Sequence, residues 1–119
     1  MYEYLAQLRR VVDGDTWILD VSLGFNIWAR GQRIRAAGLN APELSTQAGQ
    51  DAKAWVLGWF AAHCPDGAMT VRTIRDRDDD YGRLLGTVIG ADGACLNADL
   101  LASGHAVPYP PAVVGVVQG

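Results

Sequence analysis

The stretch RIRAAGLNAPEL, residues 33–44, combines side chains that could bind an anion and position a water molecule. Arg33 and Arg35 alternate along an expected strand, and a turn at Pro42 then presents Glu43. A guanidinium is a permanent planar cation that grips phosphate in a bidentate way. A carboxylate can orient or deprotonate water. The stretch is therefore either a strand end with an ordinary proline turn or an anion site with its own carboxylate.

Two other segments combine charge with turn residues, VDGDT at residues 12–16 and RDRDDDYGR at residues 75–83. Each has an ordinary explanation, since DGD is a common hairpin turn and a charged loop is readily solvated. The first departs from the aspartyl-phosphatase pattern because Trp17 occupies its last position. The second fails as a calcium hand because Tyr81 stands where glycine is required. Taken singly, the segments identify no activity.

Cysteines and histidines offer a zinc site as an alternative. Cys64 and Cys95 form no CxxC pair, and His63 and His105 lie near them in the sequence. Adjacent His63 and Cys64 would seldom both face one metal ion, and the spacing fits no common framework. We therefore expect thiols that bind no metal, and histidines that cap helices or lie at the surface.

Composition is that of one globular domain. The chain has 119 residues, of which 50% are hydrophobic and 19% charged. A net charge of −3 argues against a protein that coats nucleic acid by charge alone, but it leaves room for a local cationic pocket. The sequence shows no apolar run of roughly 18 residues and no leader. These features predict no membrane association, and a cytoplasmic location unless a leader is missing.

Hydrophobic periodicity predicts the elements that must position the charged segments. Alternation predicts strands over Tyr2–Val12, Trp17–Leu23 and Arg33–Leu39, with turns at DGD and around Gly31. Helical spacing predicts a helix over Gln47–Cys64.

The second half of the chain continues with two strands and a shorter helix. Strands are expected over Met69–Ile74 and Leu84–Ile89, and a helix over Asn97–Ala102 that ends at Gly104. Three strands, a helix, two strands and a helix is the order of a five-stranded OB-type Greek-key barrel, a mainly β (α+β) fold. We predict one domain over residues 1–107 and an irregular tail over 108–119. Four aromatic residues are expected in the core: Trp17, Trp55, Trp59 and Phe60.

Taken together, four motifs resemble the staphylococcal nuclease-like (thermonuclease) family. They are VDGDTW, RIRAAGLNAPE, DDYGRLLGTV and LNADLLASGHAVPY, and they occur in the family's order from about Arg10 to Tyr109. The resemblance implies the OB barrel that the strand order also predicts. It further implies a calcium-dependent endonuclease, a hydrolase that cleaves phosphodiester bonds of DNA and RNA with little sequence preference.

The resemblance assigns roles to individual residues. Arg35 and Arg83 match the two arginines that grip the phosphate, and Glu43 matches the glutamate that positions or activates water. Tyr81 and Tyr109 resemble tyrosines that contact the nucleotide, so the expected substrate is single-stranded or unpaired DNA or RNA. A site that grips phosphate rather than base edges has no means of reading sequence.

The expected calcium ligands depart from the family at one position. Asp15 matches the family's aspartate, and Ala41 can supply a backbone carbonyl as any residue can. Asn40 stands where the family has a carboxylate, so the site loses one negative charge, which weakens calcium binding or leaves a degenerate site. Asp79 is a candidate for compensation.

Two readings of another class remain beside the nuclease. One is a catalytically silent nuclease-like domain that binds nucleic acid or a partner protein. The other is an OB domain that binds oligosaccharide, which no specific residue favours. The presence of Arg35, Glu43 and Arg83 together favours the enzyme, because a binding module has no use for Glu43 beside an anionic ligand.

Overall fold

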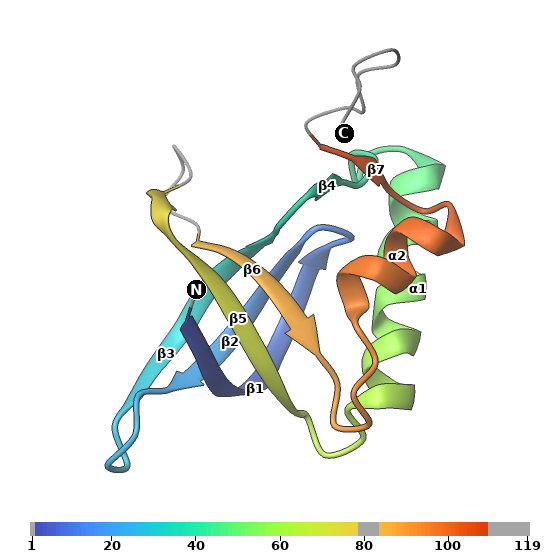
Figure 1. Ribbon diagram of the computed structural model, residues 1–119. Coiled ribbons are helices and arrows are strands. Elements are labelled where there is room, and N and C mark those ends of the chain that lie inside the picture. The colour runs from blue at the N-terminus through green and yellow to red at the C-terminus, as the bar shows by residue number, and fades with distance from the viewer. Residues whose placement is uncertain (1, 79–83, 110–119) are drawn as a thin grey trace, which may run out of the picture.

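A computed structural model describes residues 2–78 and 84–109, and within them five strands close into a barrel. The strands are β1 (Tyr2–Asp13), β2 (Thr16–Ser22), β3 (Trp28–Ala36), β5 (Ala68–Asp78) and β6 (Leu84–Ile89). Around the barrel they follow the order β1-β2-β3-β6-β5, and among these pairs β3 and β6 run parallel (Figure 1). This mixed, mainly β barrel is the predicted OB-type fold.

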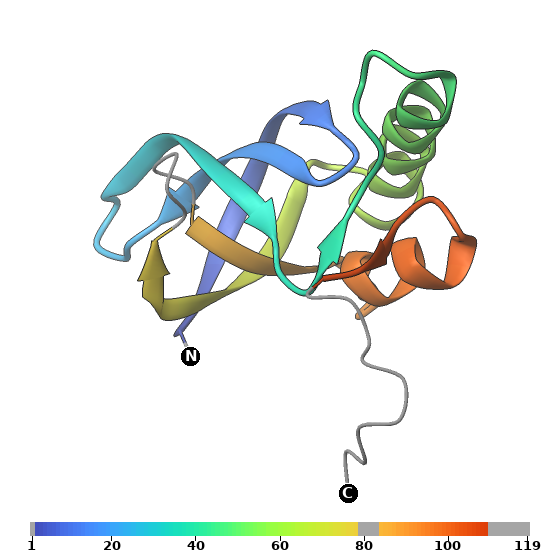
Figure 2. The ribbon, with the colours of Figure 1, turned by 90° about the horizontal axis from the view of Figure 1, so that it is seen from above.

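Two helices and a small two-stranded sheet accompany the barrel. Helix α1 (Gln47–His63) and helix α2 (Leu96–Ser103) lie together on one side of it (Figures 1 and 2). Strand β4 (Leu39–Asn40) pairs with β7 (Val107–Pro108) next to both helices. In the described part of the chain, neither helix is long and apolar enough to cross a membrane.

The core forms where inward-facing strand residues meet α1. Val11, Trp17 and Ile34 are paired across β1, β2 and β3 and are at most 5% exposed. Phe60 of α1 packs edge-on against Trp17, with 6.3 Å between ring centroids. Trp17, Phe60 and Trp59 are therefore core residues as predicted, whereas Trp55 is half-buried and packs against the core. The apolar residues at alternate positions of β2, Trp17, Leu19 and Val21, are thus buried as predicted.

The predicted turn around Gly31 is wrong. The chain turns earlier, at residues 23–27, where the Leu23 amide donates to the carbonyl oxygen of Ile27 at 2.8 Å. Gly31 instead lies inside β3 with φ +62°, at a shift in the β2–β3 register. Its amide donates to the Asp20 carboxylate at 2.8 Å. A glycine within a strand pattern is as typical of a bulge as of a turn. Here the hydrogen bond to the buried Asp20 favours the bulge.

The third strand also ends earlier than predicted. β3 stops at Ala36, and Gly38, with φ +81°, separates it from the short β4. This left-handed conformation suits glycine and interrupts an extended strand. The fourth barrel strand begins at Ala68 and runs to Asp78, beyond the predicted Met69–Ile74.

The remaining boundaries agree closely with the predictions. Helix α1 ends at His63, one residue before the predicted end, and Cys64 caps it. Helix α2 ends at Ser103, and its cap Gly104 has the left-handed conformation, with φ +84°. Cys64 and Cys95 are free thiols. The domain boundary at residue 107 stays a prediction: Pro108 pairs with Leu39 in β4, and residues 110–119 lie outside the described part.

Asn97 ties α2 to the barrel. Its side-chain oxygen accepts from the Val88 amide at 3.1 Å, and its side-chain nitrogen donates to the carbonyl oxygens of Ala37 and Gly86 at 3.0 and 3.1 Å. The residue is only 6% exposed, so water has little access to replace these bonds. One side-chain amide thus binds two backbone groups of β6 and the carbonyl of Ala37, which follows β3.

Replacing Asn97 with alanine should destabilise the domain. Asn97→Ala leaves buried backbone groups without partners, so we expect the free energy of unfolding to fall by about 2 kcal/mol or more, measured by urea denaturation. Gln50→Ala, at an exposed position of α1, is the control and should change stability by no more than about 0.5 kcal/mol. Equal, small effects of the two variants would contradict the role given to Asn97.

Candidate functional site

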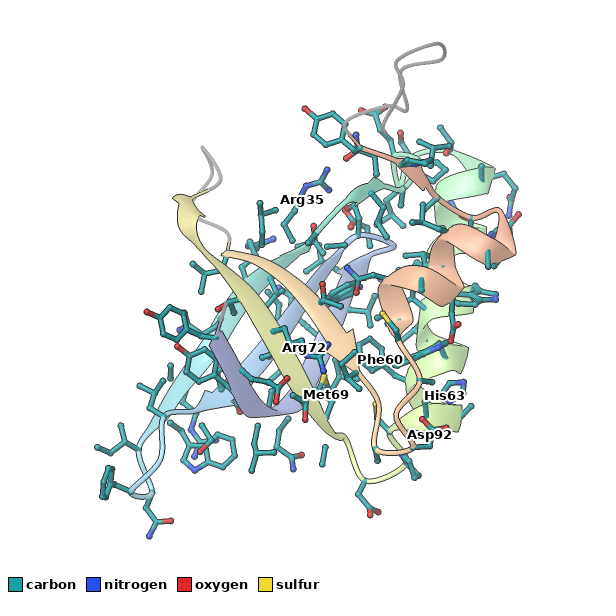
Figure 3. All side chains as sticks on the ribbon, in the orientation of Figure 1. Arg35, Phe60, His63, Met69, Arg72 and Asp92 are labelled. Atoms are coloured by element: carbon teal, nitrogen blue, oxygen red, sulfur yellow. The ribbon has the colours of Figure 1, made fainter. Side chains whose placement is uncertain are left out.

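The centre of the candidate site is an ion pair between Asp15 and Arg35. The distance from Arg35 Nη1 to Asp15 Oδ2 is 2.6 Å, and the side chains are 14% and 11% exposed. Asp15 lies in the β1–β2 turn and Arg35 near the end of β3, where it pairs with Thr16 across the sheet. Figure 3 shows Arg35 at the end of the barrel next to β4. Two residues predicted for different tasks, metal binding and phosphate binding, are therefore in direct contact.

The same carboxylate also holds the segment that leads to Glu43. Asp15 Oδ2 accepts from the Ala41 amide at 2.9 Å, while the Asp15 carbonyl accepts from the Ala36 amide at 2.8 Å. The turn itself is fixed by the Asp15 amide, which donates to Asp13 Oδ1 at 3.1 Å. Asp15 thus joins the β1–β2 turn, β3 and the β4–α1 connection.

Close packing beneath this turn explains the glycine of DGD. A Cβ atom added at Gly14 would lie 2.8 Å from the Ala41 Cβ and 3.0 Å from the Ala52 Cβ of α1. The turn is therefore pressed between the β4–α1 connection and the helix, and a larger residue would separate them. Position 14 needs glycine for this close approach.

The two aspartates of the turn have opposite electrostatic environments. Burial raises the pKa of Asp13 to about 6, and the neighbouring Asp15 carboxylate adds to the effect. Burial also acts to raise the pKa of Asp15, but hydrogen bonds from Asp13 and the Ala41 amide, together with the Arg35 guanidinium, hold it below its usual value. Asp15 is therefore the stable anion of the site, and its charge is balanced by Arg35.

Asn40 and Ala41 line a small pocket beside the ion pair. Its volume is about 200 Å³, and its other walls are Pro42 and residues 104–107. Asn40 is half-buried and pairs with Val107 in the β4–β7 sheet. The predicted calcium ligands Asp15, Asn40 and Ala41 thus lie on adjoining segments.

Glu43 is exposed in the connection between β4 and α1, four residues before the helix begins, and hydrogen bonds hold its backbone. Its carbonyl oxygen accepts from the Thr46 amide at 3.0 Å and from the Thr46 hydroxyl at 2.7 Å. The same hydroxyl accepts from the Gly49 amide at 3.0 Å and caps the helix. Sequence reasoning gave Thr46 no role, although a threonine just before a helical pattern is a known capping signal.

Gly49 is a second residue that sequence reasoning missed. A Cβ atom added there would overlap the carbonyl group of Glu43 and lie 2.9 Å from the Leu44 Cα. The first turn of α1 therefore packs directly against the backbone of Glu43. A glycine in the first turn of a helix, where alanine would be favoured, is the signal in the sequence.

The other predicted site residues are less closely tied to this centre. Tyr109 is 53% exposed, and its amide donates to the Gly38 carbonyl at 2.9 Å, which places its backbone beside the β3–β4 connection. Arg83, Tyr81 and Asp79 lie outside the described residues. Their predicted roles stay predictions.

The oxygen donors of the site are of the type that binds a hard cation, but they include a single negatively charged group. Within residues 2–78 and 84–109, no three His, Cys, Asp or Glu side chains gather into a metal-binding group. The candidate donors are the Asp15 carboxylate, the Asn40 amide oxygen and the Ala41 carbonyl, an all-oxygen set of the kind calcium prefers. Asp15 Oδ2 already accepts two bonds, whereas Oδ1 accepts from the Thr16 hydroxyl at a longer 3.3 Å. An all-oxygen set with a single carboxylate is therefore compatible with calcium.

Fold and site together define a five-stranded OB-type barrel with a buried carboxylate–guanidinium pair at one end. No protein-family model matches the sequence. The chain is 34% identical over 116 residues to Endonuclease YhcR of Bacillus subtilis (strain 168). The match covers 90% of this chain and 9% of that protein, so the chain corresponds to a small part of its relative. The similarity relates the chain to a nuclease, and the narrower assignment to the staphylococcal type stays a prediction.

Two glycines of α1 should respond in opposite ways to alanine. Gly49→Ala forces the helix away from the Glu43 backbone, so we expect a loss of stability of about 2 kcal/mol. Gly58 has open space around its Cβ position, so Gly58→Ala should stabilise the domain by about 0.5–1 kcal/mol. Thermal unfolding of both variants measures the difference. Stabilisation by both would show that the contact at Glu43 does not constrain the helix.

Proposed function

We propose that this chain is a nuclease domain that hydrolyses phosphodiester bonds of DNA and RNA. The observation that carries the proposal is the Asp15–Arg35 pair, held on the Ala41 amide directly before the Glu43 segment. The similarity to an endonuclease supports the same chemistry. Phosphodiester hydrolysis needs an oriented water, compensation of charge on the phosphoryl oxygens and help for the leaving oxygen.

Arg35 supplies the fixed cation in this proposal. Arg35 directs Nη1 at Asp15, its other side-chain N–H donors have no partner within residues 2–78 and 84–109, and we propose that they bind phosphoryl oxygens. A guanidinium held by a buried carboxylate needs little reorganisation as charge develops in the transition state. Arg83 is the proposed second cation, on the strength of its motif.

Glu43 positions or deprotonates the attacking water. Its exposed side chain projects from a backbone that Thr46 and Gly49 fix just before α1. Tyr81 and Tyr109 are the proposed contacts to the nucleotide. Aromatic stacking tolerates any base, so single-stranded or unpaired DNA or RNA with little sequence preference is the proposed substrate.

Calcium is the proposed cofactor. Asp15, the Asn40 side-chain oxygen and the Ala41 carbonyl would hold it, and the bound ion would supply positive charge at the phosphoryl oxygens. Asn40 gives this site one negative charge fewer than a carboxylate would. We therefore expect activity that needs a high calcium concentration.

A cleavage assay tests the function. With millimolar calcium the protein should degrade single-stranded DNA, and EDTA should stop the reaction. Glu43→Gln and Arg35→Ala should each lower the rate by about 100-fold or more without unfolding the domain, as checked by thermal unfolding, because they remove the base and the fixed cation. Asp66→Asn and Arg72→Ala, at exposed positions away from the site, are the matched controls and should leave the rate unchanged.

Two results of this assay would contradict the proposal. They are the absence of calcium-dependent cleavage at high protein concentration, and equal rates of the Glu43 variant and its control. Nucleic-acid binding without cleavage would instead support the catalytically silent binding module.

Position 40 gives a separate test of the metal site. Asn40→Asp adds a charged oxygen ligand, so the calcium concentration for half-maximal cleavage should fall, on the order of tenfold. Asn26→Asp makes the same substitution in the exposed β2–β3 turn and should not change it. An unchanged calcium requirement of Asn40→Asp would show that residue 40 is not a metal ligand.

A further inference from the structure

The outer face of β1–β3 carries a row of residues that the catalytic proposal does not use. The inner row of Val11, Trp17 and Ile34 is buried. Side chains alternate between the two faces of a strand, so the neighbouring row of Arg10, Ile18 and Arg33 points outward. Two arginines thus flank one isoleucine across three adjacent strands.

Neither of these arginines is neutralised. Arg10 and Arg33 are exposed, and in the part of the chain that the structure describes they have no hydrogen-bond or ion-pair partner. Other arginines of the barrel differ in this respect. Arg30 lies 3.2 Å from the Asp20 carboxylate, and Arg72 lies 2.6 Å from that of Glu3.

Ile18 shows how the two arginines are arranged. It points outward yet is only 8% exposed, and the register places an arginine on each side of it. The aliphatic part of an arginine can cover an apolar neighbour while its charged end stays in water. The two exposed arginines therefore lie beside an isoleucine side chain that has almost no contact with solvent.

Along β3, the outer face that carries Arg33 extends to Arg35 of the candidate active site. Arg33 and Arg35 share one face of β3, two residues and roughly 6.6 Å apart along the strand, and Arg10 lies two strands or roughly 10 Å away from Arg33. Figure 3 shows Arg35 at the end of the barrel next to β4, away from Arg72 on β5. Although the net charge of the protein is −3, three arginines thus lie on this outer face, and one of them, Arg35, is paired with Asp15.

We propose that Arg10 and Arg33 form a backbone-binding track for a single-stranded nucleic acid whose cleaved phosphate lies at Arg35. The inference rests on the proposed nuclease function and adds to it a second, non-catalytic contact region. Guanidinium groups bind phosphate regardless of base, so the track would add affinity without sequence preference. The two arginines are separated by two β-strand spacings, and this width suits a single flexible nucleic-acid strand.

The salt dependence of binding tests the track without any cleavage. A fluorescent oligothymidylate that is long enough to span the face is titrated in EDTA between about 50 and 200 mM salt. Each phosphate contact to a single strand contributes about 0.7 to the slope of log K against log salt, so Arg10→Gln with Arg33→Gln should lower that slope by about 1.4. Affinity at low salt should fall about tenfold. Glutamine is chosen because it keeps part of the stem beside Ile18.

Two further double variants make the result specific. Lys53→Gln with Arg72→Gln removes the same charge from other surfaces and should leave the slope as in the original protein. Arg10→Lys with Arg33→Lys keeps both charges and should also keep the slope. Thermal unfolding checks that all three proteins are folded.

The outcomes separate this inference from the proposed function. A loss confined to the Arg10/Arg33 glutamine variant supports the track, even if the protein proves unable to cleave DNA. Equal losses in the glutamine variant and the Lys53/Arg72 control overturn it, as does an unchanged slope or a failure of the original protein to bind. In those cases calcium-dependent cleavage, if observed, still supports the nuclease.

Discussion

The buried contact between Asp15 and Arg35 is the interaction on which the rest of the site depends. Removing two charges from water is costly, and the cost is offset only when geometry and additional hydrogen bonds are good. Here the Ala41 amide provides such a bond to the same oxygen that Arg35 contacts. Loss of either charged partner would leave the other buried and uncompensated. The pair therefore constrains the β1–β2 turn, β3 and the β4–α1 connection together.

This constraint also sets the charge of the site. Asp13 and Asp15 are two residues apart, yet burial and its neighbour raise the pKa of Asp13, whereas hydrogen bonds and Arg35 lower that of Asp15. With a pKa of about 6, Asp13 is mostly ionised at pH 7 and takes up a proton in mildly acidic solution, whereas Asp15 remains an anion there. An amide at position 40 adds no further negative charge beside it, so the ion pair is close to neutral as a unit. A cation that binds here would meet an oxygen-rich surface in which Arg35 already offsets the charge of Asp15.

Several strands and helices could be predicted because the local sequence patterns that favour them agree with the tertiary structure. The alternation of Trp17, Leu19 and Val21 predicted β2, and the helical spacing of Val56, Trp59 and Phe60 predicted α1. Gly31 was misread because a glycine allows both a turn and a bulge. The deciding factor was the buried Asp20, which accepts the Gly31 amide and pairs with arginines on either side. No local pattern around Gly31 contains that information.

Local patterns in the sequence predict the succession of strands and helices along the chain and the residue types of the candidate site, because periodicity, caps and motif spacing are local properties. Which of these residues are in contact follows from the three-dimensional structure. It placed Arg35 against Asp15 and Gly49 against Glu43. It also placed Arg10 and Arg33 on one outer face, where the described residues give neither of them an ion-pair partner. The physical reason is that such contacts join segments distant in the chain. Strand register and close packing bring them together, and neither can be predicted from the residues of one of the two segments alone.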